Sequence, residues 1–376
     1  MRIYYIGIYD FQDAKIPRRY TVSAVNKMTY IAQVLLGLYP ETRVVSLALP
    51  VGKRFFYSHN NITKNGISTH FFPFFGFLRH ERLIDMWRSM CLFLYGLFHF
   101  HKGDVIISYH TSSLASNVLV RLRKIKKVKI ILEVEEIYSD LLKSANTVWK
   151  REQCAFENSD GYIFSTEMLA EKINKKQLPS VVIYGTYQSD TESRIKDDDL
   201  VHVVYAGTFD PRKGGAAAAA AAAYLPNNYH LHICGFGKQK EIDDIKSVIN
   251  ELREKGHNVS YEGLLKGQNY LDMLHKCQIG LSTQVPSAKF NNTSFPSKIL
   301  SYMSAGLAVV SISIPAIEGS KVGKYITFYE NQTPEEIARS IIKCDISQGE
   351  RNKDVIASLD AGFKKELKSC IQEVLS

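Results

Sequence analysis

The stretch with the clearest chemistry is Tyr205–Gly215, which reads YAGTFDPRKGG. It follows a short apolar run, and its glycines flank a turn that carries Arg212 and Lys213. A helix that begins directly after such a turn offers free backbone N–H groups and a partial positive charge. With the two cations added, this pattern predicts a site for a diphosphate. The alternative is an ordinary strand–loop–helix connection with solvated basic residues.

A second stretch of the same kind is Asn292–Val310, which reads NTSFPSKILSYMSAGLAVV. Pro296 fits the first turn of a helix that Ser294 or Ser297 would cap, and Lys298 stands at the start of that helix. The alternative is again an ordinary capped helix. Two cationic helix starts that follow strands of one α/β domain would converge on a nucleotide-like ligand.

Both stretches are positioned by apolar runs that alternate with amphipathic segments. Most of these runs are continuous in Val, Ile, Leu and Tyr, which is typical of strands buried on both faces of a parallel sheet. Strand and helix in alternation predict βαβ units. The strands expected in the first half are Arg2–Ile8, Arg43–Leu49, Gly66–Pro73, Asp104–His110, Val128–Val134, Gly161–Ser165 and Val181–Tyr184. The helices expected there are Val22–Leu38, Glu81–Phe100, Ser113–Lys124 and Trp149–Asn158.

The charged segment Ser189–Leu200 has no apolar pattern and predicts a linker. A second alternating series follows it, so the expected fold is α/β with two Rossmann-like doubly wound domains. We expect these domains at residues 1–190 and 201–350, a linker at 191–200 and a closing helix at 351–376. The strands expected in the second half are Val201–Ala206, Tyr229–Cys234, Val259–Tyr261, Ile279–Ser282, Ala308–Ile312 and Tyr325–Tyr329. The helices are Ala216–Leu225, Lys240–Lys255, Asn269–Lys276, Lys298–Ser304, Pro334–Lys343 and Ile356–Val374.

The segment Ala216–Ala223 is a run of eight alanines. Alanine is the best helix former, so the run predicts a helix. Methyl groups give that helix only a small apolar stripe for packing on a sheet. Either the helix lies very close to the sheet, or the alanines stand in for side chains that were not identified.

Composition and charge narrow the class of protein. Hydrophobic residues make up 45% and charged residues 23% of the 376 residues, which excludes a disordered chain and a collagen. The net charge of +9 favours anionic partners such as phosphates. The six cysteines form no C-x-x-C pair, so they indicate no disulfide framework or zinc site and fit a reduced compartment. No signal peptide is expected, and the longest apolar run, Met90–Phe98, is too short to cross a bilayer.

The second half of the chain resembles the donor domain of a GT-B glycosyltransferase, most closely glycosyltransferase family 4 of the bacterial surface-polysaccharide type. That family has G-R-x4-K-G where this chain has GTFDPRKG, and P-S-K-x-x-E-Y-M-A-x-G-x-P-V-V where it has PSKILSYMSAGLAVV. The G-x-G of Gly235–Gly237 and the YEGLL of Tyr261–Leu265 also match elements of the family. The resemblance spans about residues 201–345. It implies two domains that face a cleft and a closing helix that packs back on the N-terminal domain.

The resemblance also implies roles for single residues. Lys213 would pair with the donor diphosphate, and Lys298 with nearby N–H groups would hold the distal phosphate or the sugar. The loop at Glu262–Leu265 would contact the base, and Gly235 would let the nucleotide approach the backbone. The donor-site residues expected in this way are Gly207, Thr208, Arg212, Lys213, Gly214, Gly235, Glu262, Gly263, Leu264, Ser294, Phe295, Pro296, Ser297, Lys298 and Ser301.

Three positions depart from the family pattern. The family's Arg in the first motif falls on Thr208, for which Arg212 would substitute. Its E-x7-E pair, which contacts the sugar and the ribose, falls on Thr293 and Ser301. These departures leave the donor and the stereochemistry open. They also motivate the alternative of a catalytically silent GT-B subunit that binds a partner transferase or the membrane.

Catalytic candidates in the first half follow two strands. His110 ends the run DVIISYH, and Glu135 and Glu136 follow KIILEV, where relatives often have a His–Asp pair. A carboxylate beside a buried sheet would have a raised pKa and act as general base. It would equally serve as an anion at a helix N-terminus. The loop from Asp10 to Arg19 lies where acceptors bind in this fold.

Two segments suggest the acceptor. Phe71–Phe77 reads FFPFFGF, and Arg121–Lys129 reads RLRKIKKVK. Apolar wedges beside basic patches suit an anionic bilayer surface, and a polyprenyl-diphosphate-linked sugar would present both features. The alternatives are a buried strand with a hairpin and a solvated helix end. Nucleic acid is disfavoured, because no aromatic residues interleave with the basic run.

The sequence thus predicts a metal-independent glycosyltransferase without a cofactor. It would move a sugar from a nucleotide diphosphate sugar, UDP-linked in preference to GDP-linked, to a hydroxyl of a glycan or lipid-linked oligosaccharide in polysaccharide biosynthesis. The one D-x-D-like segment, Asp197–Asp199, lies in the predicted linker, far from any strand end. The protein would be cytoplasmic, with peripheral contact at the inner face of the cell membrane.

Overall fold

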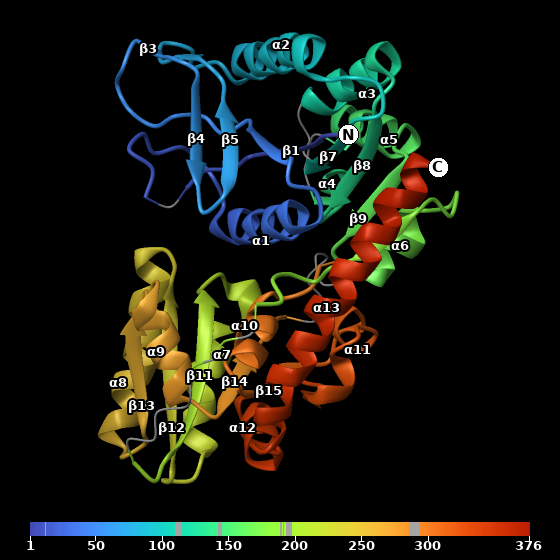
Figure 1. Cartoon of the computed structure of the whole chain (residues 1–376). Coiled ribbons are helices and arrows are strands. Elements are labelled where there is room, and N and C mark those ends of the chain that lie inside the picture. The colour runs from blue at the N-terminus through green and yellow to red at the C-terminus, as the bar shows by residue number, and fades with distance from the viewer. Residues whose placement is uncertain are drawn as a thin grey trace. The chain divides into compact units, whose positions relative to one another are not determined.

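The computed structural model describes residues 1–11, 13–109, 114–141, 145–188, 190, 192, 198–285 and 294–376, which form two compact units (Figure 1). Unit 1 comprises Met1–Ile183 and Gly362–Ser376, and unit 2 comprises Tyr184–Ala361. The first boundary precedes the segment expected as a linker, because Tyr184 already stacks on Phe295 of unit 2. The second boundary falls inside the closing helix rather than at its start.

Unit 1 is built on an eight-stranded sheet with the order β10-β9-β8-β7-β1-β2-β5-β4. All neighbouring strands in it are parallel except β4 and β5, which form an antiparallel hairpin. A separate two-stranded ribbon joins β3 and β6. The strands are β1 (Ile3–Gly7), β2 (Arg43–Ser46), β3 (Phe56–Tyr57), β4 (Asn60–Lys64), β5 (Ile67–Phe71), β6 (Phe74–Phe75), β7 (Val105–Tyr109), β8 (Lys129–Val134), β9 (Gly161–Phe164) and β10 (Ser180–Val182).

The central strands of this sheet are buried because helices cover their apolar side chains. Tyr4 and Ile106 of the sheet form one core cluster with Leu92 and Phe100 at α2. Phe363 of α13 stacks on Tyr30 of α1 with ring centroids 5.9 Å apart, so the end of the chain packs within unit 1. The helices are α1 (Val22–Leu38), α2 (Glu81–His99), α3 (Ala115–Lys126), α4 (Tyr138–Leu141), α5 (Ala145–Glu157), α6 (Glu167–Ile173) and the last part of α13 (Gln348–Leu375).

Unit 2 holds a six-stranded, fully parallel sheet with the order β13-β12-β11-β14-β15-β16. Its strands are β11 (Val201–Thr208), β12 (Tyr229–Phe236), β13 (Val259–Gly263), β14 (Ile279–Ser282), β15 (Ala308–Ile312) and β16 (Ile326–Tyr329). Its helices are η1 (Pro211–Lys213), α7 (Gly215–Ala220), η2 (Ala221–Tyr224), α8 (Gln239–Glu254), α9 (Gln268–Lys276), α10 (Lys298–Ser304), α11 (Pro315–Glu318), η4 (Gly323–Tyr325) and α12 (Pro334–Lys343), with the first part of α13.

The alanine run does form helix, and it lies against the sheet. α7 packs on β11 and β12, and its Ala218 and Ala219 are fully buried. The following turn tightens to a 3₁₀ helix, so the α-helix ends earlier than expected. Small side chains allow this close approach of helix and strands.

In each sheet the strand order reverses once near its centre. In unit 1 the reversal lies between β1 and β7, and in unit 2 it lies between β11 and β14. Such reversal points are where open α/β sheets bind ligands, outside the carboxyl ends of the strands. The predicted α/β class with two Rossmann-like units is confirmed. Ligand sites are expected at the carboxyl ends of the strands beside the two reversal points.

Candidate functional site

The two stretches singled out in the sequence meet at the reversal point of unit 2. β11 ends at Thr208 and leads through η1 into α7. β14, its neighbour in the sheet, ends at Ser282, and α10 begins at Lys298 further along the same connection. The intervening residues 286–293, which include Thr293, lie outside the described residues.

Lys298 is the most unusual side chain at this edge. Its Nζ is buried and has no hydrogen-bond partner among the described residues. The ammonium lies 4.1 Å from the centre of the Tyr205 ring, and a Cβ added to Gly207 would come within 3.1 Å of it. Burial, aided by the charge of Lys213, lowers the pKa of Lys298 to about 7. A buried cation without a counter-ion is unfavourable, so the position suits an anionic ligand.

Lys213 brings a second cation to the same place. Its Nζ donates to Oε1 of Gln284 over 3.2 Å, so the side chain reaches from the β11 side to the β14 side of the reversal point. Thr283 Oγ1 donates to the carbonyl oxygen of Lys213 over 2.8 Å. The N–H of Val285 donates to the carbonyl oxygen of Arg212 over 2.9 Å. These bonds tie the turn after β11 to the loop after β14.

Two amides and a hydroxyl at this edge were not expected from the sequence. Gln284 is buried beside Lys213, and Nε2 of Gln332 and Oγ of Ser282 are buried without a partner among the described residues. All three follow or end strands of the sheet, which is the one sequence signal that they share. Gln332 Nε2 and Ser282 Oγ are further polar atoms that a ligand would satisfy.

Two of the predicted glycines are required by packing. Gly214 has a φ of 72°, and a Cβ there would lie 2.1 Å from Nε2 of Gln332. Gly235 has a φ of 152°, and a Cβ there would lie 1.9 Å from the carbonyl oxygen of Gly207. The structure thus gives Gly235 a role in strand packing, and close approach of a nucleotide at this glycine stays a prediction.

Arg212 already has an anionic partner. Its Nη2 lies 2.6 Å from Oδ2 of Asp210, and its side chain is 67% exposed. The hydrogen bonds from Arg212 lower the pKa of Asp210 to about 2. Thr208, which occupies the position of the family's arginine, is partly buried at the end of β11. Substitution of Arg212 for that arginine stays a prediction.

The residues that lead into α10 differ in their exposure. Phe295 is buried and stacks on Tyr184 with ring centroids 4.9 Å apart. Ser297 is the N-cap of α10 without a side-chain capping bond, and Pro296 precedes the cap instead of opening the first turn. Ser294 and Ser301 are partly buried. None of these side chains changes the local charge, which comes from Lys298.

Glu262 is engaged within unit 2. Its Oε1 accepts hydrogen bonds from His232 Nδ1 over 2.7 Å and from Ser260 Oγ over 2.5 Å. The bond with His232 is the main cause that lowers the pKa of Glu262 to about 2. A contact with the base of a nucleotide would therefore come more readily from Gly263 and from the half-exposed Leu264.

In unit 1, Glu135 follows β8 and forms an ion pair. Its Oε1 lies 2.5 Å from Nζ of Lys27 on α1, and the same ammonium donates to the carbonyl oxygen of Ile183 over 2.8 Å. Glu136, next along the chain, is partly buried. His110, the competing candidate, lies outside the described residues, so its role stays a prediction.

A carboxylate that the sequence analysis did not single out lies directly behind this ion pair. Glu133 of β8 is fully buried, and Tyr5 donates its hydroxyl to Oε2 over 2.5 Å. Burial first, and then the charge of Glu135, raises the pKa of Glu133 to about 8. The raised pKa expected for a carboxylate beside this sheet is thus found at Glu133. The only sequence signal was a charged residue within an apolar run.

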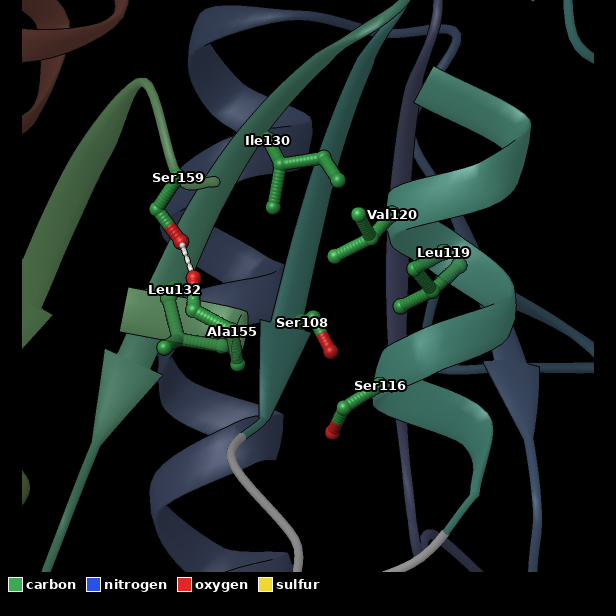
Figure 2. Close-up of a pocket in the computed structure, with 8 residues that line it drawn as sticks. All are labelled: Ser108, Ser116, Leu119, Val120, Ile130, Leu132, Ala155 and Ser159. Atoms are coloured by element: carbon green, nitrogen blue, oxygen red, sulfur yellow. Dashed lines mark hydrogen bonds between the residues drawn. The ribbon is translucent and has the colours of Figure 1, made fainter. Parts of the chain in front are cut away.

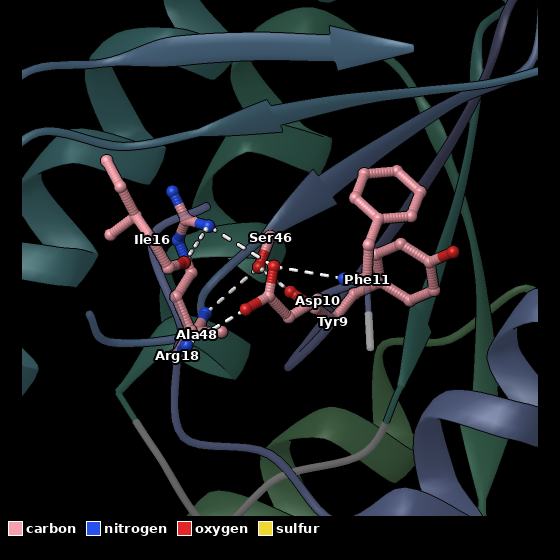
Figure 3. A network of polar contacts seen from close by, with 7 residues as sticks. All are labelled: Tyr9, Asp10, Phe11, Ile16, Arg18, Ser46 and Ala48. Atoms are coloured by element: carbon pink, nitrogen blue, oxygen red, sulfur yellow. Dashed lines mark hydrogen bonds and ion pairs between the residues drawn. The ribbon is translucent and has the colours of Figure 1, made fainter. Parts of the chain in front are cut away.

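Asp10 and Arg18 shape the loop after β1 (Figure 3). Asp10 is fully buried and accepts from the N–H groups of Phe11 and Arg18 over 3.0 and 2.9 Å. Arg18 Nη1 lies 3.2 Å from Oδ1 of Asp10, and its guanidinium is 3.6 Å from the centre of the Phe71 ring. Both side chains are used inside the loop, whereas Arg19 is exposed and would meet an acceptor more easily.

Unit 1 also contains a small cavity between α3 and strands β7 and β8 (Figure 2). Ser108, Ser116, Ile130 and Leu132 are among the residues that line it. Its volume of about 10 Å³ is room for about one water molecule. It is too small for a sugar and is not the substrate site.

No helix among the described residues combines the length and apolar character that crossing a membrane requires.

Comparisons with known proteins agree with the fold. Residues 200–344 match the model of the family described as "Glycosyl transferases group 1". A comparison with curated proteins gives no match. Among solved structures, the chain is similar to Anabaena Alr3699/HepE in complex with UDP and glucose, with a TM-score of 0.65 and 13% identity over 98% of this chain and 99% of that one.

Two further structures show the same similarity over nearly their whole length. Sucrose-phosphate synthase (tll1590) from Thermosynechococcus elongatus has a TM-score of 0.70 and 14% identity over 99% of this chain and 98% of that one. The pneumococcal O-GlcNAc transferase GtfA in complex with UDP and GlcNAc has a TM-score of 0.63 and 10% identity, covering 100% of this chain and 99% of that one. The chain therefore has the GT-B fold, and within it residues 200–344 match the domain of the glycosyl transferases group 1.

Proposed function

We propose that this protein is a glycosyltransferase of the family 4 type that takes its sugar from a UDP-linked donor. The observation that carries the proposal is the buried Nζ of Lys298, which lacks a described counter-ion and lies near Lys213 at the reversal point of unit 2. Two neighbouring cations suit the charge of a diphosphate. The match of residues 200–344 and the UDP in the complexes of the similar Anabaena and pneumococcal proteins support a UDP-sugar.

The two lysines would act on the leaving group. When the bond between the sugar and the diphosphate breaks, negative charge develops on the diphosphate oxygens. An ammonium held in place before the reaction stabilises that charge without reorganisation, and it does so more strongly where water is excluded. Lys298 meets both conditions. Two cations supplied by the chain itself support a transfer that is metal-independent and needs no cofactor.

The acceptor hydroxyl must lose its proton during the transfer. In unit 1 the candidates for this base remain Glu135 and Glu136, which follow β8, and His110, which lies outside the described residues. Glu133 is unsuited to the role, because it is fully buried and bonded to Tyr5. Its protonated form would instead limit the number of negative charges beside Glu135.

The experiment is a binding and turnover panel with UDP, GDP, dTDP and CDP and their sugars, all with EDTA. Lys298→Met removes the charge at nearly constant size, and Lys255→Met serves as control because Lys255 is an exposed partner of Glu251 on α8. We expect one nucleotide to bind the wild type and the control, and Lys298→Met to bind it about ten to a hundred times more weakly. No binding by any nucleotide contradicts the donor site. Binding without turnover on any acceptor would favour a silent subunit.

We further propose that the acceptor is lipid-linked and that unit 1 docks on the cytoplasmic face of the membrane. Exposed apolar residues lie along α2 at helical spacing. This helix is on the same side of unit 1 as β3 (Figure 1). Phe55 and Phe77 extend this surface, with ring centroids 5.2 Å apart and exposed fractions of 72% and 56%. The residues of this apolar surface are Phe55, Phe56, Phe77, Leu83, Met86, Met90, Leu94 and Phe98.

Basic residues border the apolar surface at both ends. Lys53, Arg54, Arg79 and Arg82 are exposed near its phenylalanines. At the other end, Lys126 of the basic run on α3 donates to the carbonyl oxygen of Leu97 over 2.8 Å. Apolar side chains ringed by cations suit an anionic bilayer. Phe71 and Phe74 of the segment Phe71–Phe77 are buried and do not take part.

Co-sedimentation with liposomes tests the docking surface. We expect the wild type to bind vesicles that contain anionic lipid and to be released by salt, because screening weakens contacts between exposed charges. Phe98→Glu should abolish binding, whereas Ile342→Glu, a matched change at an exposed residue of α12, should not. Equal binding by both variants would contradict the proposal that this surface docks on the membrane. This result would not bear on the proposed donor site.

A further inference from the structure

Three histidines gather in the sheet of unit 2, apart from the lysine pair. His202 of β11 stands opposite His230 of β12 in the strand register, and His232 follows two residues later. Residues two apart on a strand share a face of the sheet, whereas Tyr205, three residues after His202, projects from the opposite face. The ammonium of Lys298 lies over the ring of Tyr205. The histidines therefore lie on the opposite face of the sheet from Lys298.

The histidines bring their ring nitrogens close together. One ligating nitrogen of each ring lies within 4.8 Å of those of the other two. His202 and His232 are each only 3% exposed, and His230 is partly exposed and gives access from solvent. His230 and His232 are stacked with ring centroids 4.1 Å apart, which fixes their relative orientation.

Each ring also has an oxygen partner. Histidines that bind metals almost always donate their second N–H to a carboxylate, carbonyl or water, which fixes the tautomer. Here the three contacts are His202 Nε2 to Asp198 Oδ1 at 2.9 Å, His232 Nδ1 to Glu262 Oε1 at 2.7 Å, and His230 Nε2 to Ser260 Oγ at 3.0 Å. The remaining nitrogens of the two buried rings, Nδ1 of His202 and Nε2 of His232, face each other at 2.8 Å.

The hydrogen bonds of the two buried rings call for one further cation, either a proton that supplies a third N–H or a metal ion. The chain Asp198–His202–His232–Glu262 contains three hydrogen bonds, and each needs one N–H. Two neutral imidazoles carry only two N–H groups. A cation between the inner nitrogens would leave both N–H groups for the carboxylates, and the two carboxylates would compensate a divalent charge.

We propose that His202, His230 and His232 bind a divalent transition-metal ion of the zinc class. Imidazole nitrogens suit Zn²⁺, Ni²⁺ and Cu²⁺, and three histidines with one open position are a known zinc donor set. Nitrogens around a tetrahedral Zn²⁺ lie roughly 3.3 Å apart, which follows from Zn–N bonds of about 2.0–2.1 Å. His202 and His232 would therefore separate slightly, and His230 would close in. The ion would join β11 and β12 and, through Glu262, β13, on the face of the sheet opposite Lys298.

One charge near the cluster opposes the ion. Lys276 of α9 interacts electrostatically with His230 and disfavours further positive charge there. Asp198 and Glu262 contact the rings directly through hydrogen bonds. The two carboxylates at contact distance outweigh one ammonium whose influence on the cluster is indirect.

The experiment uses the full chain without an affinity tag, freed of metal with EDTA and dialysed. Titration with Co²⁺ should give the visible absorption of four-coordinate cobalt, saturating at one ion per chain, and Zn²⁺ should displace it. Zn²⁺ should also raise the thermal unfolding temperature. His230→Ala, at the most exposed of the three ligands, should abolish the cobalt spectrum, whereas the control His257→Ala in the same unit should retain it.

The wild type alone is enough to overturn the proposal. No one-to-one cobalt binding, or a spectrum of six-coordinate cobalt that survives in His230→Ala, would show that the histidines form only a hydrogen-bond network. Nucleotide binding by His230→Ala reports whether the variant is folded. Loss of metal with retained nucleotide binding is the expected pattern, and the reverse pattern would place the metal elsewhere.

Discussion

The buried ammonium of Lys298 should make the affinity for the donor depend on pH. Its pKa is about 7 in the free protein because the group is buried and lies near Lys213. A bound diphosphate supplies opposite charge and hydrogen-bond acceptors, which raises the pKa of Lys298 in the complex. The protonated form is the one that binds, so above pH 7 binding takes up one proton.

The magnitude follows from this shift. Below about pH 6 the side chain is protonated in both the free and the bound protein, and this group makes no contribution to pH dependence. Above pH 7 each pH unit should raise Kd about tenfold, which is about 1.4 kcal/mol, until the pKa of the complex is reached. Between pH 6 and pH 8.5, Kd should therefore rise about thirtyfold.

Isothermal titration with UDP-glucose measures both Kd and proton uptake when it is repeated in buffers of different ionisation enthalpy. The donor sugar is preferable to UDP, because the terminal phosphate of UDP itself titrates at about pH 6. Lys298→Met should bind weakly, with no proton uptake above pH 7. A wild-type Kd that is constant from pH 6 to pH 8.5, without proton uptake, would refute the reasoning.

Three further predictions concern stability. Without ligand, Lys298→Met should be more stable than the wild type below pH 7 by about 1–4 kcal/mol in denaturant unfolding, because it removes an unpaired buried charge. Equal stability would mean that the charge is already compensated. Gly235→Ala should lose about 1–3 kcal/mol because its Cβ meets the Gly207 carbonyl oxygen, whereas Gly362→Ala, with open space around it, should lose nothing. Glu133, with a pKa of about 8 in the fold against about 4.5 unfolded, should make the wild type lose stability as pH rises from about 5 to 8. Glu133→Gln should remove that loss, and an unchanged pH profile in this variant would contradict the assignment.

Much of the fold could be predicted because its strands are continuous apolar runs. The expected Val22–Leu38, Ile279–Ser282 and Ala308–Ile312 agree with the structure to the residue. The strand β4 was missed because NNITK is mostly polar, as an edge strand can be. Its signal was the dipeptide Asn65–Gly66, whose φ angles of 51° and 79° form the tight turn of the hairpin.

The charged centre of the candidate site was also accessible from the sequence. Lys213 and Lys298 were identified because cations after strand ends share one edge of a parallel sheet. Gln284 was missed, because its place shortly after β14 is the one sequence signal that marks it. The state of Lys298 depends on the tertiary burial of a single atom, which no spacing encodes.

Contacts between segments that lie far apart in the sequence could not be predicted either. The partner of Glu135 is Lys27, which lies 108 positions earlier in the chain. The alternation of His230 and His232 is visible in the sequence, but His202 joins them only through the register of β11 and β12. The spacing of the cysteines carries no information about this cluster.

A crystal structure of the protein with UDP would test the central claim most directly. We predict that the diphosphate lies at the reversal point between β11 and β14, with an oxygen within hydrogen-bonding distance of Lys298 Nζ and another near Lys213. A complex in which UDP binds elsewhere, or in which the ammonium of Lys298 stays without an anion, would contradict the proposed donor site.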